Sequence, residues 1–188
     1  MSFVAPERTA TADFVLRCYL PGDGAALQEA TVASYAHLKP WMPWATKTQT
    51  VEQAEALTRQ FRAAYLISKD FVIAAFDPTE TRIIGGCGFH LRDGPIESRQ
   101  AEVGMWVREG LEERGLGTAM LHEMVRWGFA DWPWLRISWR CNTGNQRSRR
   151  VAEKNGLRLE GVLRGMYDDV SGGRRDMAVY AILRHEAG

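Results

Sequence analysis

The stretch that most constrains the fold is a strand-like segment followed directly by a glycine turn, a helix and another strand. Residues 101–108 (AEVGMWVR) have strand composition, the turn EERGLG follows at 112–117, and a helical spacing of apolar residues continues to about Ala130. LRISWRC, at 135–141, then alternates apolar and polar residues like a strand with one packed face. A strand–helix–strand unit brings its two strands together in parallel. We therefore expect parallel pairing within an α/β fold.

The rest of the chain adds further strands and helices around this unit. Strands are predicted at 14–20, 71–76, 82–91, 157–164 and 174–183, and helices from Ala25, after Thr50 and within 143–156. Thr50 and Gln53 form a capping-box pattern, and Gly156 is a typical left-handed helix stop. Neighbouring strands that short turns connect should pair antiparallel. We expect a mixed sheet in a single domain at 13–188, after a flexible N-terminal tail at 1–12.

Charge and composition exclude several classes of partner. The chain has 188 residues with 24 basic and 23 acidic side chains, a net charge of +1. Such a balance gives no field that would attract nucleic acid or an anionic membrane, so neither is expected as a partner. No signal peptide or transmembrane stretch is recognisable, which predicts a cytoplasmic protein.

The cysteines and histidines predict no metal site. Cys18, Cys87 and Cys141 lie in apolar stretches without metal-type spacing, so we interpret them as reduced core residues. The four histidines form no metal-spaced pair either. Any anion that the chain binds must be held by a local site.

The glycine turn is the best candidate for such a site. A dinucleotide fingerprint requires a third glycine where Met120 stands, and a P-loop requires a lysine between Gly117 and Thr118. Both interpretations fail. What is left is a helix N-terminus whose free N–H groups suit a pyrophosphate, with Arg114 adding charge. The alternative, that Gly115 and Gly117 only permit a tight turn, stays open.

Three segments together resemble a known family. EVGMWVREGLEERGLGTAML, ISWRCNTGNQRSRRVAEKNGLRLEGVLRG and GGRRDMAVYAIL are similar to the GNAT superfamily of N-acetyltransferases, and most closely to its RimJ/RimL type. HLKPWMPWA and FVLRCYLPGD are similar to that type as well. The resemblance implies the GNAT fold, a mixed twisted sheet of about seven strands with helices on both faces. It also implies acetyl-CoA as co-substrate, no metal, and a protein N-terminal amine as acceptor.

The resemblance also assigns residues to the donor site. The family turn has Gln or Arg, two free positions, Gly, one free position, then Gly or Ala. Gly115 and Gly117 match it, whereas Glu112 departs from it. The backbone of the strand before the turn pairs with the pantetheine arm and can polarise the acetyl carbonyl. The implied cofactor-binding residues are Met105, Trp106, Val107, Glu112, Arg114, Gly115, Leu116, Gly117, Thr118 and Asn145.

The catalytic roles follow partly from the resemblance and partly from the residues. On the resemblance, Ser148 assists the departing CoA thiolate and Asn145 contacts the cofactor, although both are also ordinary helix caps. Glu102 lies on the same strand face as Trp106 and is the candidate general base, with a solvated edge carboxylate as the alternative. The family has a glutamate at the position of Tyr167, which is assigned to the substrate pocket.

The loop KPWMPW supplies the other candidate acceptor residues. Pro40 and Pro43 flank Trp41 and Trp44 and disfavour a regular element there, so the two rings wall an acceptor cleft or form an aromatic plug. The sequence thus predicts direct acetyl transfer in a ternary complex. Acetylation of a small-molecule amine or antibiotic, and an acyl-CoA sensor without catalysis, are the alternatives. A monomer and a homodimer fit equally well.

Overall fold

The computed structural model describes residues 3–168 and 172–187, so the first two residues of the predicted tail lie outside the described part. Contacts divide the chain into two compact units. The first unit runs to His90 and includes Met105–Leu116; the second comprises Leu91–Gly104 and the chain from Gly117 onward. The single domain expected from sequence stays a prediction, and each unit is described separately.

The first unit contains four antiparallel strands in chain order. They are β1 (Arg8–Ala10), β2 (Val15–Cys18), β3 (Phe71–Phe76) and β4 (Ile83–His90). β1 falls within the predicted N-terminal tail, yet it pairs with β2 in the register Thr9↔Leu16. Thr11 closes the connection, because its N–H donates to the carbonyl of Phe14 at 2.9 Å. Three residues are too short to produce a recognisable alternation, which is why sequence analysis missed this strand.

Three helices complete this unit: α1 (Gly24–Ala33), α2 (Tyr35–Leu38) and α3 (Val51–Leu66). The capping box is confirmed, since Thr50 Oγ1 accepts from the N–H of Gln53 at 3.2 Å and Gln53 Oε1 accepts from the N–H of Thr50 at 3.0 Å. α1 contacts α3 and β4. Their shared core consists of Val15, Tyr19, Leu27, Ala30, Ala54, Ala74, Phe76 and Ile83, and Trp106 packs against it.

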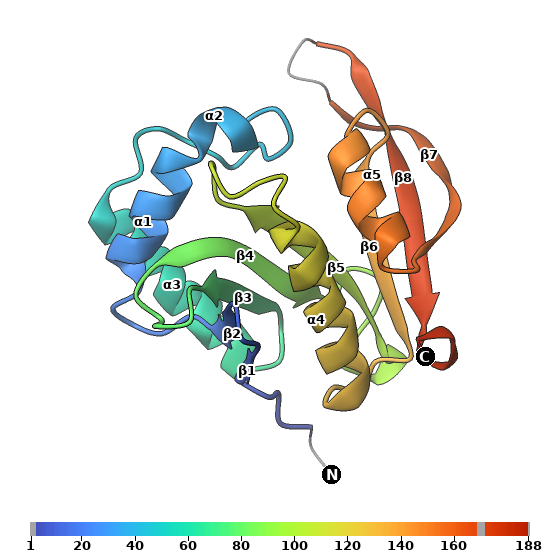
Figure 1. The fold of residues 1–188 in the computed structure, drawn as a ribbon, viewed down its shortest axis with the longest axis horizontal. Helices are drawn as coiled ribbons and strands as arrows, with labels where there is room; N and C mark the ends of the chain where they lie inside the picture. The colour runs from blue at the N-terminus through green and yellow to red at the C-terminus, as the bar shows by residue number, and fades with distance from the viewer. Residues whose placement is uncertain (1–2, 169–171, 188) are drawn as a thin grey trace. The chain divides into compact units, whose positions relative to one another are not determined.

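The second unit supplies the parallel geometry. The first residues of β5 (Gln100–Val107) run parallel to β6 (Arg136–Asn142), with Gln100 opposite Arg136 and Glu102 opposite Ser138. β8 (Arg174–Leu183) is antiparallel to β6, and β7 (Arg158–Asp168) is antiparallel to β8 (Figure 1). The predicted mixed sheet and α/β class are confirmed. The described part has eight strands where about seven were expected, because β1 was not anticipated.

In the part of the chain that the structure describes, two helices belong to this unit. They are α4 (Leu116–Ala130), which belongs to it from Gly117 onward, and α5 (Gln146–Lys154), which contacts β6. Two short 3₁₀ turns span Ile96–Ser98 and Arg184–Glu186. Gly156 follows α5 with φ of 77°, as its role of helix stop requires.

The predicted apolar face of α4 forms the core of the second unit. Met120, Met124 and Trp127 are all buried. Trp127 meets Trp132 edge to face with 5.4 Å between ring centroids, and Trp132 stacks on Trp134 at 5.8 Å. The aromatic cluster therefore anchors the end of α4 beside the start of β6.

The predicted core position of the cysteines is confirmed. All three cysteines are free and buried. Burial raises the pKa of the Cys87 thiol, which makes it a poor nucleophile. Among the described residues, no helix is both long and apolar enough to cross a membrane.

Gly86 on β4 provides space for Trp106 at the end of β5. A Cβ atom built at Gly86 would lie 2.4 Å from Nε1 and 3.0 Å from Cε2 of Trp106. We expect Gly86→Ala to lower the free energy of unfolding by about 1–3 kcal/mol, because the indole must move within a packed core. Urea unfolding measures this. Gly161→Ala is the control, since nothing lies within 4 Å of its added Cβ; equal stability of the two variants would contradict the prediction.

Candidate active site

The end of β5 is the segment where backbone contacts to the donor are predicted. Met105, Trp106 and Val107 are its last three residues, and their side chains are half-buried. The ladder between β5 and β6 ends at Glu102, so these three residues lie beyond it. A strand end of this kind can offer backbone N–H groups to an extended ligand, which is the role that sequence analysis assigned to it.

Trp106 connects this strand to the loop KPWMPW at residues 39–44, called the tryptophan loop below. Its indole packs on the first unit's core and meets the ring of Trp44 edge to face, with 6.3 Å between centroids and an interplanar angle of 65°. The side chain of Trp44 is 52% exposed and that of Trp41 is 40% exposed. Such exposure disfavours a buried aromatic plug. It leaves Trp41 and Trp44 as candidate walls for an acceptor.

The tryptophan loop is held by its own backbone and one lysine. The carbonyl of Leu38 accepts from the N–H groups of Trp41 and Met42 at 2.9 Å and 2.8 Å. Lys39 Nζ donates to the carbonyls of Pro43 and Ala45 at 3.0 Å and 3.2 Å. The loop thus has a defined conformation that begins at the end of α2.

Arg108 fixes the start of the glycine turn. Its buried guanidinium binds both carboxylate oxygens of Glu29 on α1. The backbone N–H of Arg108 donates to the carbonyl of Ile84 at 2.9 Å. Hydrogen bonding to Arg108 lowers the pKa of Glu29. This pair therefore stabilises the fold fully at a pH above the ordinary pKa of a glutamate. The stabilisation is lost as the pH falls through the lowered pKa of Glu29.

Two more contacts tie the turn to the same helices. The N–H of Glu109 donates to Ser34 Oγ at 3.0 Å, and Ser34 itself is fully buried between α1 and α2. Farther along, Glu112 Oε1 lies 3.3 Å from Nδ1 of His37 on α2. Sequence analysis assigned no role to Ser34, Arg108 or His37, because only the tertiary structure brings α1 and α2 to the turn.

Three residues between β5 and α4 adopt the left-handed region. They are Gly110, which precedes the glycine turn, and Glu113 and Gly115 within it, with φ of 84°, 63° and 84°. α4 begins at the next residue, Leu116, and the predicted Gly117 and Thr118 lie in its first turn. The first N–H groups of any helix lack intrahelical acceptors. Arg114 and Gly115 are exposed beside them. Such a helix start can accept an anion, and the positive φ of Gly115 also satisfies the tight-turn alternative.

Ser148 lies in the first turn of α5, where the helix faces β6. Its Oγ accepts from Nε1 of Trp139 at 3.1 Å. Cys141 lies on the same strand; burial raises the pKa of its thiol, and the neighbouring Ser148 hydroxyl opposes the increase. Sequence analysis placed Trp139 and Cys141 on one strand face but could not show that this face meets Ser148.

Asn145 caps α5. Its side-chain oxygen accepts from the N–H of Ser148 at 3.1 Å. The cap interpretation is therefore correct for the structure, and it gives Ser148 a fixed backbone position. A role of Asn145 toward the cofactor stays a prediction.

Glu102 is engaged by two arginines. Its side chain is 4% exposed, and its oxygens lie 3.0 Å from Arg92 and 3.2 Å from Arg140. Arg140 also donates to Asp93 at 2.6 Å. The alternative of a solvated edge carboxylate is thus wrong. To act as a base, Glu102 would have to release one guanidinium.

Tyr167 lies on β7 opposite Arg175, and its side chain is 42% exposed. A ring with this exposure can contact an acceptor. A tyrosine cannot supply the carboxylate that the family has at this position.

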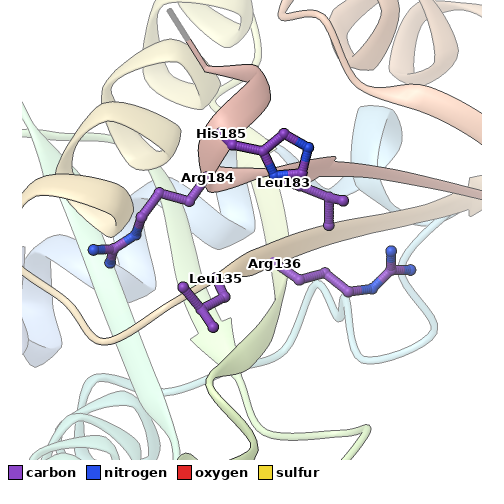
Figure 2. Close-up of a pocket in the computed structure, with 5 residues that line it drawn as sticks. All are labelled: Leu135, Arg136, Leu183, Arg184 and His185. Atoms are coloured by element: carbon purple, nitrogen blue, oxygen red, sulfur yellow. The ribbon is translucent and has the colours of Figure 1, made fainter.

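A shallow pocket in the second unit lies at the start of β6 (Figure 2). Its lining residues are Leu135, Arg136, Leu183, Arg184 and His185. Figure 2 shows the two arginines extending away from each other. Arg136 binds Glu160, and Arg184 donates to the carbonyls of Trp132 and Trp134. Because these cations serve the fold, the pocket offers no converging charge for a phosphate.

Comparisons with known proteins agree with this geometry. Residues 14–158 match the family described as Acetyltransferase (GNAT) domain. The chain is 26% identical to the Bacillus subtilis (strain 168) protein named "Putative ribosomal N-acetyltransferase YdaF", over 91% of both chains.

Solved structures show the same fold. RimJ of Mycobacterium smegmatis, in complex with CoA-disulfide, is 25% identical, with a TM-score of 0.79 over 92% of this chain and 83% of that one. The ribosomal-protein-S5-alanine acetyltransferase of Vibrio fischeri is 17% identical, with a TM-score of 0.84 over 97% and 100% of the two chains. Because the family model matches residues 14–158, the chain belongs to the GNAT family and is an acetyl-CoA-dependent N-acetyltransferase.

Proposed function

We propose that this enzyme acetylates the N-terminal α-amine of a protein, by direct attack of the amine on acetyl-CoA in a ternary complex. The supporting observation is the similarity, over 91% of both chains, to a protein named for ribosomal N-acetylation. RimJ of Mycobacterium smegmatis adds to this support. The exposed Trp41 and Trp44 give the acceptor an apolar wall.

The proposed donor site uses mainly backbone groups. The diphosphate lies at the start of α4, where Gly115 leaves the N–H groups accessible and Arg114 adds a positive charge. The N–H groups of Met105–Val107 hold the pantetheine arm and the acetyl carbonyl. As the amine attacks, negative charge develops on the carbonyl oxygen, and a backbone N–H aimed at that oxygen stabilises the transition state.

Ser148 is proposed as the group that assists thiolate departure. Because its oxygen accepts from Trp139, its own hydrogen is available for donation to a second partner. In the proposed reaction this second partner is the sulfur of the leaving CoA. The C–S bond breaks as the C–N bond forms, and the hydroxyl donates its hydrogen bond, or its proton, to the thiolate.

An N-terminal amine makes a small demand on a base. Its ordinary pKa of about 8 leaves a useful neutral fraction near neutral pH, whereas a lysine amine with a pKa of about 10.4 needs stronger assistance. This difference favours the N-terminal acceptor in a site where Glu102 is held by Arg92 and Arg140. We retain Glu102 as the proposed proton acceptor, through water, after the amine has attacked. Free buried cysteines fit a reducing compartment, so we place the enzyme in the cytoplasm.

The acceptor class is tested by release of free CoA thiol from acetyl-CoA. A peptide with a free N-terminus should be acetylated at least about tenfold faster, in kcat/KM, than the same peptide with a blocked N-terminus and a free lysine. Polyamines and aminoglycosides form the comparison set. Preference for one of these would favour the small-molecule alternative, and binding of acetyl-CoA without thiol release from any amine would favour the sensor.

The role of the glycine turn is tested by Gly115→Asn. Asparagine tolerates the left-handed backbone better than other residues with a side chain, so the turn should survive with less than about 1 kcal/mol of lost stability. Its side chain would nevertheless occupy the space of the phosphate oxygens. We expect the Kd for CoA in calorimetry to rise by more than about tenfold. An unchanged Kd with an unchanged stability would reduce Gly115 to a turn residue.

The role of Ser148 is tested by Ser148→Ala. We expect kcat to fall by about 10- to 100-fold, because the thiolate loses its hydrogen-bond donor, while the Kd for acetyl-CoA stays within about threefold. Stopped-flow turnover and calorimetry provide the two values. Ser98→Ala, on an exposed 3₁₀ turn, is the matched serine control. If both variants retain full kcat, Ser148 is only part of the helix start.

A further inference from the structure

The glycine turn has an unfavourable charge for a site that binds a diphosphate. Between Arg108 and Gly117 the sequence has three glutamates, at 109, 112 and 113, against the two arginines 108 and 114. The guanidinium of Arg108 already binds Glu29. Carboxylates beside a diphosphate raise the free energy of the bound state, so the turn needs a way to offset them.

Glu112 is the carboxylate of this segment that contacts α2. Its Oε1 lies 3.3 Å from Nδ1 of His37, and the two side chains are only 21% and 23% exposed. The contact therefore determines where the carboxylate at the family's Gln/Arg position lies.

The backbone around His37 is itself anchored. Ser34, at the start of α2, accepts from the N–H of Glu109 and donates to the carbonyl of Ala30 at 2.7 Å. The N–H of Leu38 donates to the carbonyl of Ser34 at 2.9 Å, which closes the single turn of α2 around His37. The imidazole thus projects from a fixed one-turn helix. The fixed backbone of α2 therefore holds the imidazole where it contacts Glu112.

We propose that His37 is a positioning residue of the donor site. It holds the carboxylate of Glu112 against α2 and so keeps it from the N–H groups of Gly115 and Leu116, which the diphosphate uses. This inference rests on the proposed donor role of the turn. It explains how an acidic residue is compatible with anion binding at a position where the family has Gln or Arg. An ion pair that served only stability would affect every ligand equally.

The test compares a donor that has the diphosphate with one that lacks it. In His37→Ala the carboxylate of Glu112 loses its contact with α2, and the Kd for CoA should rise about three- to tenfold in calorimetry. The kcat/KM for S-acetylpantetheine, which has no diphosphate, should stay within about twofold. The additional change Glu112→Gln should restore the Kd for CoA to within about twofold of Glu112→Gln alone, because no carboxylate is then left to control.

Glu113→Gln is the matched control for charge. Added to His37→Ala, it removes one negative charge from the neighbouring residue and leaves Glu112 in place, so it should not restore CoA binding. An unchanged Kd for CoA in His37→Ala, equal losses with both donors, or equal restoration by Glu113→Gln would overturn the proposal. Loss of folding in His37→Ala without rescue by Glu112→Gln would overturn it too. Failure of the wild-type protein to bind CoA would instead refute the donor site itself.

Discussion

The buried guanidinium of Arg108 is the constraint on which the first unit's part of the site depends. A buried charge is costly unless it is paired and hydrogen-bonded, and Glu29 on α1 supplies both oxygens that satisfy it. Because Arg108 follows β5 directly, this pair fixes where the strand ends and the glycine turn begins. The contacts of Ser34 with Glu109 and of His37 with Glu112 continue the same attachment along the turn.

This attachment connects the proposed donor and acceptor sites through α2. α2 contacts the turn through His37, and the tryptophan loop begins where α2 ends. A proposed donor element and a proposed acceptor element therefore share one support within the first unit. In the second unit, Trp139 and Asn145 play a similar part for Ser148, since one binds its hydroxyl and the other its backbone N–H. In both places neighbouring side chains fix the position of a proposed functional segment.

Local patterns predicted most elements of the fold. Thr50 and Gln53 cap α3 as the sequence indicates, and Gly156 ends the region of α5 with a positive φ. Such signals depend on a few neighbouring residues, so sequence alone can reveal them. β1 was missed because three residues show no periodicity. The solvated alternative for Glu102 was wrong because the arginines that bury its charge come from a loop and from another strand.

The sequence by itself determined the strand–turn–helix–strand order, the capping signals and the resemblance to N-acetyltransferases. Each of these depends on short stretches of sequence and follows from residue propensity, hydrophobic periodicity and motif spacing. Only the tertiary structure decided which side chains meet: Glu112 with His37, 75 positions earlier in the sequence, and Trp139 with Ser148 across a strand and a helix. Such contacts depend on how helices pack against strands, and no local pattern records that packing.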